Sequence, residues 1–104
     1  MEKVAFKMKL KPGAKEEYIK RHDAIWSALK SLLKEYKISD YTIFLDEETD
    51  TLFAVQKISG SKNSQDIGSN EIVKKWWEYM ADLMETNEDK SPVTTPLLKV
   101  FHLN

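Results

Sequence analysis

The amino-acid sequence predicts an α+β fold, in which helices cover one face of an antiparallel β-sheet. Alternating residues, or runs of β-branched and aromatic residues, mark strand-like segments at 3–10, 41–45, 52–58 and 97–103. Apolar residues spaced mostly three or four positions apart mark helical segments at 14–36 and 72–84. Because the polar turn at 46–50 is short, the second and third strands are expected to pair as an antiparallel hairpin.

Local signals justify the separate elements. Strict alternation in residues 3–10 predicts a strand with one buried face. The second helix is expected to begin after Ser69 or Asn70, since either residue suits a helix N-cap. The polar segment 59–70, between the hairpin and this helix, contains Gly60 and Gly68 and is predicted to be a loop, which need not contact a functional site.

The order of elements is therefore β-α-β-β-α-β, the ferredoxin-like arrangement with both helices on one face of the sheet. The other sheet face is predicted to be partly apolar, with contributions from Ala5, Phe44, Phe53, Val55 and Phe101. A chain of 104 residues builds only a modest core and leaves much of its surface exposed. We therefore expect a homodimer in which two protomers pack sheet to sheet.

Length and composition limit the classes of protein to consider. We expect one domain, residues 1–104. The net charge of -1, without a basic block, argues against nucleic-acid binding. No apolar run is long enough to span a membrane, and the N-terminal residues contain no apolar signal core. Because cysteine is also absent, we expect a cytoplasmic protein without disulfides or thiolate chemistry.

The first helix carries an imidazole on the face that should contact the core. His22 lies four residues after Tyr18 and three before Ile25, on one apolar stripe. A purely structural stripe needs no imidazole, so this position indicates a functional pocket. The alternative is a histidine at the rim of the core that is bonded to a backbone carbonyl.

Aromatic side chains form a second group of candidates. Trp76 and Trp77 are adjacent in the second helix, so their side chains point about 100° apart. One could pack in the core while the other lines a cavity, where indole suits a flat-faced ligand such as a sugar. Alternatively, both belong to the core. Tyr41 would join Tyr18 and His22 if it faces the helices, and would otherwise lie at the sheet edge.

Metal and cofactor sites are not indicated. The chain has two histidines and no cysteine, and it lacks any recognised metal-ligand spacing. It also lacks a glycine-rich phosphate-binding loop and a Gly-x-Ser-x-Gly nucleophile motif. An aromatic pocket with one imidazole and a few hydroxyls suits a neutral, polyhydroxylated ligand and proton transfer without a cofactor.

Longer motifs surround these candidates. They are Glu17-Tyr18-Ile19-Lys20-Arg21-His22 with Asp23-Ala24-Ile25-Trp26, Asp40-Tyr41-Thr42-Ile43-Phe44-Leu45-Asp46, Trp76-Trp77-Glu78-Tyr79-Met80-Ala81-Asp82-Leu83-Met84, and then Asn87, Asp89 and Ser91-Pro92. With these motifs, essentially the whole chain from Val4 to Phe101 resembles the L-rhamnose mutarotase family. The double tryptophan followed by Tyr-Met-x-Asp is the most specific part of the resemblance.

The resemblance implies a dimeric α+β barrel of ferredoxin-like protomers. It implies interconversion of the α and β anomers of L-rhamnose, with no metal or organic cofactor. It also implies a histidine proton donor, which falls on His22. The implied sugar contacts fall on Tyr18, Tyr41, Trp76 and Trp77.

Anomer exchange needs a proton donor near the ring oxygen and a proton acceptor near the anomeric hydroxyl. A histidine with an ordinary pKa can donate and recover a proton near neutral pH, and the rate would then fall at alkaline pH. The acceptor stays open between water, a tyrosine and Asp82. The C6 methyl of the sugar would suit Met80, Met84 or a tryptophan edge. His102, where the family more usually has an aromatic residue, lines the site only if the last strand does.

Two other functions remain open on the same dimeric barrel. One is a different cofactor-free enzyme, similar to a monooxygenase, which sugar turnover without oxygen uptake would exclude. The other is a small-molecule-binding module, which would bind its ligand without accelerating anomer exchange.

Overall fold

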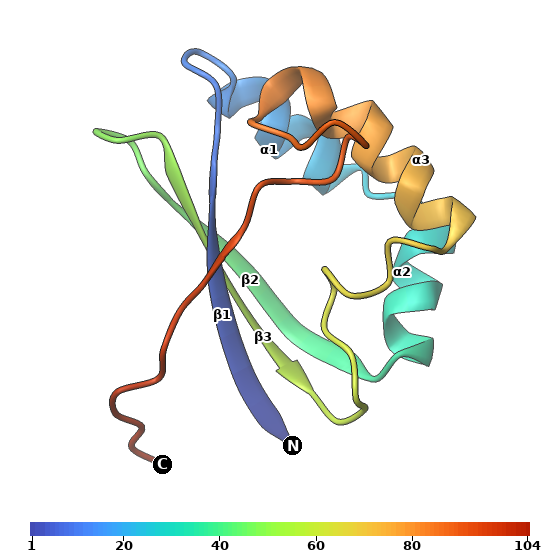
Figure 1. Cartoon of the computed structure of the whole chain (residues 1–104), viewed down its shortest axis with the longest axis vertical. Coiled ribbons are helices and arrows are strands. Elements are labelled where there is room, and N and C mark those ends of the chain that lie inside the picture. Colours follow the sequence, from blue (N-terminus) through green and yellow to red (C-terminus); the bar gives the residue numbers. More distant parts are fainter.

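The computed structural model describes residues 1–104 and contains an antiparallel four-stranded sheet with its helices on one face (Figure 1). Its strands are β1 (Glu2–Lys9), β2 (Ile38–Asp46), β3 (Thr51–Ile58) and β4 (Thr95–Pro96), in the sheet order β2-β3-β1-β4. Its helices are α1 (Lys15–Asp23), α2 (Ser27–Glu35), α3 (Glu71–Met80) and the 3-10 turn η1 (Ala81–Leu83). This arrangement confirms the predicted ferredoxin-like α+β fold.

The core lies between the sheet and the helices, on the side where the alternating apolar residues of β1 and β3 meet. Phe6 pairs with Ala54 and Met8 pairs with Leu52, and all four residues are buried. A shift of one residue in this register would turn the whole apolar row away from the helices, so burial specifies the pairing. Gln56 continues the buried row of β3 although its side chain is polar.

The single helix predicted over residues 14–36 is wrong, because the chain breaks into α1 and α2 at residues 24–26. Trp26 has an extended backbone conformation, with φ -61° and ψ 133°. Its ring packs against Trp76 and Tyr79 of α3, with ring centroids 5.1 and 5.5 Å away. A large aromatic contact between helices thus accompanies the break, although the apolar periodicity continues through it.

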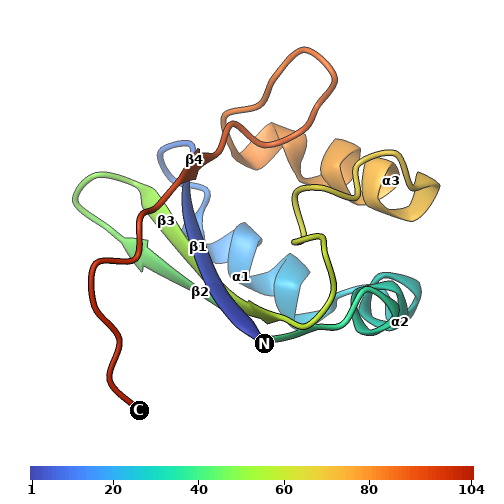
Figure 2. The same cartoon turned by 60° about the horizontal axis from the view of Figure 1, so that its bottom comes forward.

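The last strand predicted at residues 97–103 is also wrong. β4 contains only Thr95 and Pro96, which pair with Lys7 and Phe6 of β1. One further backbone bond follows, from the amide of Leu97 to the carbonyl of Ala5 at 2.9 Å. The remaining tail leaves the sheet, as Figures 1 and 2 show, and exposes four large apolar residues, Leu98, Val100, Phe101 and Leu103.

Helix α3 begins at a specific cap. Of the two candidates, Asn70 is the N-cap, and its side-chain oxygen accepts a hydrogen bond from the amide of Ile72 at 2.8 Å. The amphipathic pattern that predicted a helix to residue 84 is divided between α3 and η1. The cap stabilises the first turn of the helix that carries Trp76 and Trp77.

The sheet face away from the helices carries the expected apolar patch. The cross-strand pairs Ala5–Val55 and Phe44–Phe53 lie on this face, and Phe44 is 61% exposed. Phe101 does not join them, because it lies in the tail. No helix of the structure is both long and apolar enough to cross a bilayer.

Candidate active site

A cavity of about 1280 Å³ opens between the helices and the sheet. Its walls come from α1, α2, α3, β2 and the loop at residues 59–70. All five residues that the sequence singled out line it, namely Tyr18, His22, Tyr41, Trp76 and Trp77. These five residues come from α1, β2 and α3, three elements that are well separated in the sequence.

His22 is held by its own helix. Its ring nitrogen Nδ1 lies 3.1 Å from the carbonyl oxygen of Tyr18, one turn earlier in α1. A carbonyl only accepts, so Nδ1 carries the proton and donates it in this bond. In the neutral ring, Nε2 is then an unprotonated acceptor. The carbonyl bond that would mark a purely structural histidine is therefore present, but it leaves one nitrogen free for chemistry.

Aromatic rings enclose the imidazole of His22. The Tyr18 ring lies 4.3 Å from it, centroid to centroid, and the Trp76 ring meets it edge-on at 5.4 Å. This burial lowers the pKa of His22, and the hydrogen bond to Tyr18 opposes the shift only in part. The expectation of an ordinary pKa is wrong, because the aromatic surroundings disfavour the charged ring. At neutral pH the imidazole is mainly uncharged.

The two cavity phenols stay protonated. Burial is the main cause that raises the pKa of Tyr18, and the nearby Tyr41 adds to the effect. Burial also raises the pKa of Tyr41, against hydrogen bonds that lower it. Because Tyr41 lines the cavity together with Tyr18 and His22, it faces the helices, which is one of the two orientations considered from the sequence. Both phenols can offer hydrogen bonds to a polyhydroxylated ligand.

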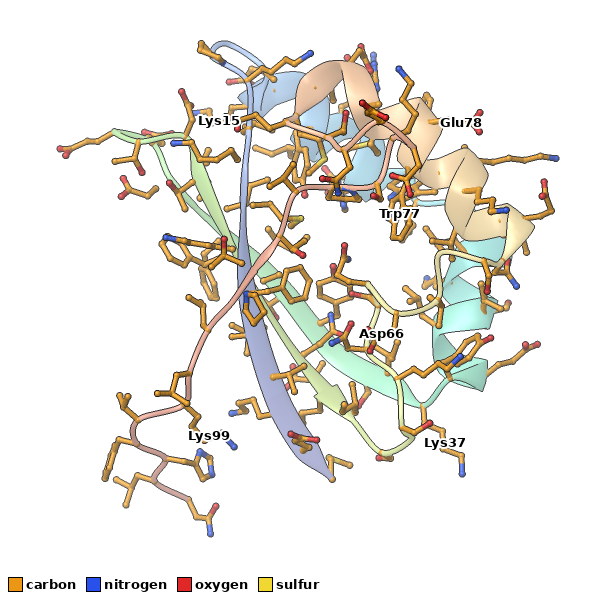
Figure 3. All side chains as sticks on the ribbon, in the orientation of Figure 1. Lys15, Lys37, Asp66, Trp77, Glu78 and Lys99 are labelled. Carbon is orange, nitrogen blue, oxygen red and sulfur yellow. The ribbon has the colours of Figure 1, made fainter.

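The two tryptophans differ in their surroundings. Trp76 is buried against Trp26, His22 and Tyr79. Trp77 is half-buried and extends from α3 toward the sheet, whereas the neighbouring Glu78 points away (Figure 3). Both indoles line the cavity, so the strict division into one core and one cavity residue does not hold.

The loop at residues 59–70 contributes directly to the cavity, contrary to expectation. Ser64, Gln65 and Ile67 are among the lining residues. At Gly68, an added Cβ would lie 2.5 Å from Cζ3 of Trp77, so the loop backbone lies closely against the indole. The sequence contained one signal that this loop packs against β3. Gln56, a polar residue in the otherwise apolar row of β3, bonds to Ser64.

Two other candidates lie outside the cavity. Asp82, one of the possible proton acceptors, pairs instead with Arg21, whose Nη1 is 2.9 Å from its carboxylate oxygen. His102 lies in the exposed tail, where its Nε2 is 2.9 Å from the side-chain oxygen of Asn104.

The remaining wall is apolar. Met80 and Met84 are buried and line the cavity, as expected of a surface for a methyl group. No three histidine, aspartate or glutamate side chains gather in a group that could hold a metal ion. The cavity therefore combines aromatic and apolar walls with two phenols, one neutral imidazole and the polar groups of the loop.

Several known proteins match this chain along essentially its whole length. The family model described as L-rhamnose mutarotase matches residues 3–103. L-rhamnose mutarotases of Formosa agariphila and Bacteroides thetaiotaomicron are each 58% identical, over 99% and 100% of both chains respectively. A crystal structure of an L-rhamnose mutarotase from Formosa agariphila superimposes with a TM-score of 0.93 at 55% identity, over the full length of both chains.

The sequence resemblance and the expected ferredoxin-like fold of the single chain are thereby confirmed. The family model covers nearly all of the chain, and the relatives match it at full length with more than half of their residues identical. The chain belongs to the L-rhamnose mutarotase family.

Proposed function

We propose that this chain interconverts the α and β anomers of L-rhamnose inside the cavity, and that His22 moves the proton. The observation that carries the proposal is the bonding of His22. Its Nδ1 is committed to the Tyr18 carbonyl, while the ring as a whole lines the cavity. Membership of the family supports anomer exchange as the reaction, and the bonding of His22 supports this residue as the proton carrier.

The chemistry requires one proton to change place between two oxygens. In our proposal, Nε2 of neutral His22 takes the proton from the anomeric hydroxyl. The C1–O5 bond breaks as C1 becomes an aldehyde carbon, and the ring oxygen takes the proton from the imidazolium. Rotation about C1–C2 and the reverse sequence then close the ring on the other face of C1. Because both oxygens are bonded to C1, a single nitrogen can serve as acceptor and then as donor.

The surroundings of His22 suggest roles for the other residues. We assign Tyr18 and Tyr41 to hydrogen bonds with sugar hydroxyls, since both phenols are protonated and line the cavity. The half-buried Trp77 suits stacking on the sugar. The buried Trp76 contacts His22 edge-on and would limit its movement as well as border the sugar.

The apolar patch of the open sheet face and the apolar tail support a homodimer, with the tail of one protomer covering the partner. Leu98, Val100 and Phe101 are 86%, 87% and 78% exposed, which is unfavourable for large apolar side chains in water. A sheet-to-sheet pair would bury both features at once. The cytoplasmic location stays a prediction.

The first prediction concerns catalysis. His22→Gln keeps a hydrogen-bonding side chain but cannot exchange a proton near neutral pH, so anomer exchange should fall by about 100-fold or more. Saturation-transfer NMR on equilibrated L-rhamnose measures the exchange directly, with and without protein. His102→Gln makes the same change at an exposed residue outside the cavity and should stay near the wild-type rate.

Two results would contradict this proposal. A folded His22→Gln protein with the wild-type rate would remove His22 from the mechanism. A wild-type protein that binds L-rhamnose without accelerating exchange would instead be a binding module, and oxygen uptake would indicate the monooxygenase-like alternative.

The second prediction concerns pH. Because burial lowers the pKa of His22 from its ordinary value of 6.5, the neutral, active form should dominate at pH 7. The value of kcat/KM should therefore be level near neutrality and fall as the pH drops through a pKa below 6.5. Polarimetry, started from one pure anomer and corrected for spontaneous exchange, gives this profile. A loss of rate with rising pH near neutrality would mean that the protonated ring is the active form.

The third prediction concerns assembly. Light scattering at micromolar concentration should give twice the chain mass of 12.1 kDa. Deleting residues 98–104 should shift the equilibrium toward the single chain, since this removes the apolar tail. Lys99→Ala, which keeps the apolar residues of the tail, should leave the mass unchanged. A 12.1 kDa species for the intact protein would contradict the dimer.

A further inference from the structure

A buried polar pair joins the sheet to the cavity loop. Gln56 of β3 is fully buried, and Ser64 of the loop is only 6% exposed. The amide of Ser64 donates to Oε1 of Gln56, and Nε2 of Gln56 donates to Oγ of Ser64, both at 2.8 Å. A buried amide without partners would be costly, so this reciprocal bonding fixes the two side chains relative to each other.

The hydrogen bonds at Ser64 determine where its proton goes. Its Oγ accepts from Nε2 of Gln56 at 2.8 Å and from Nε2 of Gln65 at 3.2 Å. A serine hydroxyl has two lone pairs and one proton, so both acceptor positions are taken. The proton is left for the third neighbour, the hydroxyl of Tyr41 at 3.4 Å.

The donors and acceptors at the Tyr41 hydroxyl can be counted in the same way. Its oxygen accepts from Ser64, and this hydrogen bond lowers the pKa of Tyr41 against the larger effect of burial, as a donor to that oxygen does. The phenol must therefore direct its own proton elsewhere. Tyr41 lines the cavity, which is where an acceptor on a ligand would be.

We propose that Gln56 and Ser64 are positioning residues, which hold Tyr41 as a hydrogen-bond donor to an oxygen of the bound sugar. This inference rests on the proposed role of Tyr41 in sugar binding. A sugar hydroxyl can both donate and accept, so a tyrosine free to do either would accept several orientations of the ring. A tyrosine held as a donor selects those orientations that present a lone pair to it.

The test is a double-mutant cycle on the binding of L-rhamnose. Ser64→Ala removes the donor to Tyr41, and Tyr41→Phe removes the donor to the sugar. Each single change should raise the dissociation constant, measured by titration calorimetry, by about fivefold, the usual scale for one hydrogen bond. The double variant should also lose about fivefold rather than about 25-fold, because Ser64 acts only through Tyr41. KM should follow the dissociation constant, with kcat little changed.

Controls separate positioning from general structural damage. Ser61→Ala, the same change at an exposed serine of the same loop, should bind as the wild type does. If Ser64→Ala does not fold, Ser64→Cys keeps nearly the same volume with only a weak donor and takes its place in the cycle. Multiplicative losses in the double variant, or wild-type binding by a folded Ser64 variant, would overturn the proposal.

This outcome is distinguishable from failure of the proposed function. Binding is measured without turnover, so the cycle reports on Tyr41 even if no anomer exchange is found. Conversely, a wild-type rate enhancement with no coupling between Ser64 and Tyr41 would leave the mutarotase assignment intact and remove only the positioning role.

Discussion

The contact between α1 and α3 is the interaction on which the candidate site depends. Arg21 of α1 donates from Nη1 to the carbonyl of Tyr79 at 2.6 Å and to the Asp82 carboxylate at 2.9 Å. The Arg21 side chain is only 13% exposed and also pairs with Glu17, so several hydrogen bonds fix one guanidinium. The next residue in the chain is His22. The hydrogen bonds of Arg21 therefore hold α1 in the position where the imidazole of His22 contacts the ring of Trp76.

The break between α1 and α2 serves the same contact. Because the helix ends at Asp23, Trp26 can turn toward α3 and pack edge-on against Trp76, whose ring also meets His22. The imidazole is thereby placed among aromatic rings, and the same rings that position it also lower its pKa. The aromatic rings around His22 thus determine both the position of its imidazole and its protonation state.

The periodic segments of the fold could be predicted from the sequence. Strict alternation located β1 closely, because a strand with one buried face repeats every two residues. The run of residues 52–58 after a short polar turn located β3. The helix break could not be found this way, since Ile25 and Trp26 continue the apolar spacing and a tertiary contact accompanies the break. The predicted strand at residues 97–103 was wrong for a related reason. The apolar residues of the tail favour burial, but the sequence does not show which surface would bury them.

Some residues of the candidate site could be predicted from the sequence, and others could not. His22 and Tyr18 were found because an imidazole interrupts an apolar helical stripe, a local signal. Ser64 was missed because it lies in a polar loop without periodicity, and its contact with Tyr41 exists only in the folded chain. Gln56 offered a signal, a polar residue in a buried row, which becomes interpretable once its partner is known.

The central claim is that His22 is a neutral imidazole with its proton on Nδ1, ready to accept at Nε2. Nitrogen-15 NMR of the histidine rings, followed over pH, tests this directly, because the shifts of the two nitrogens report the tautomer and the pKa. The account predicts a protonated Nδ1 and an unprotonated Nε2 at pH 7, with a pKa below 6.5. A proton on Nε2 at pH 7, or a pKa of 6.5 or higher, would contradict it.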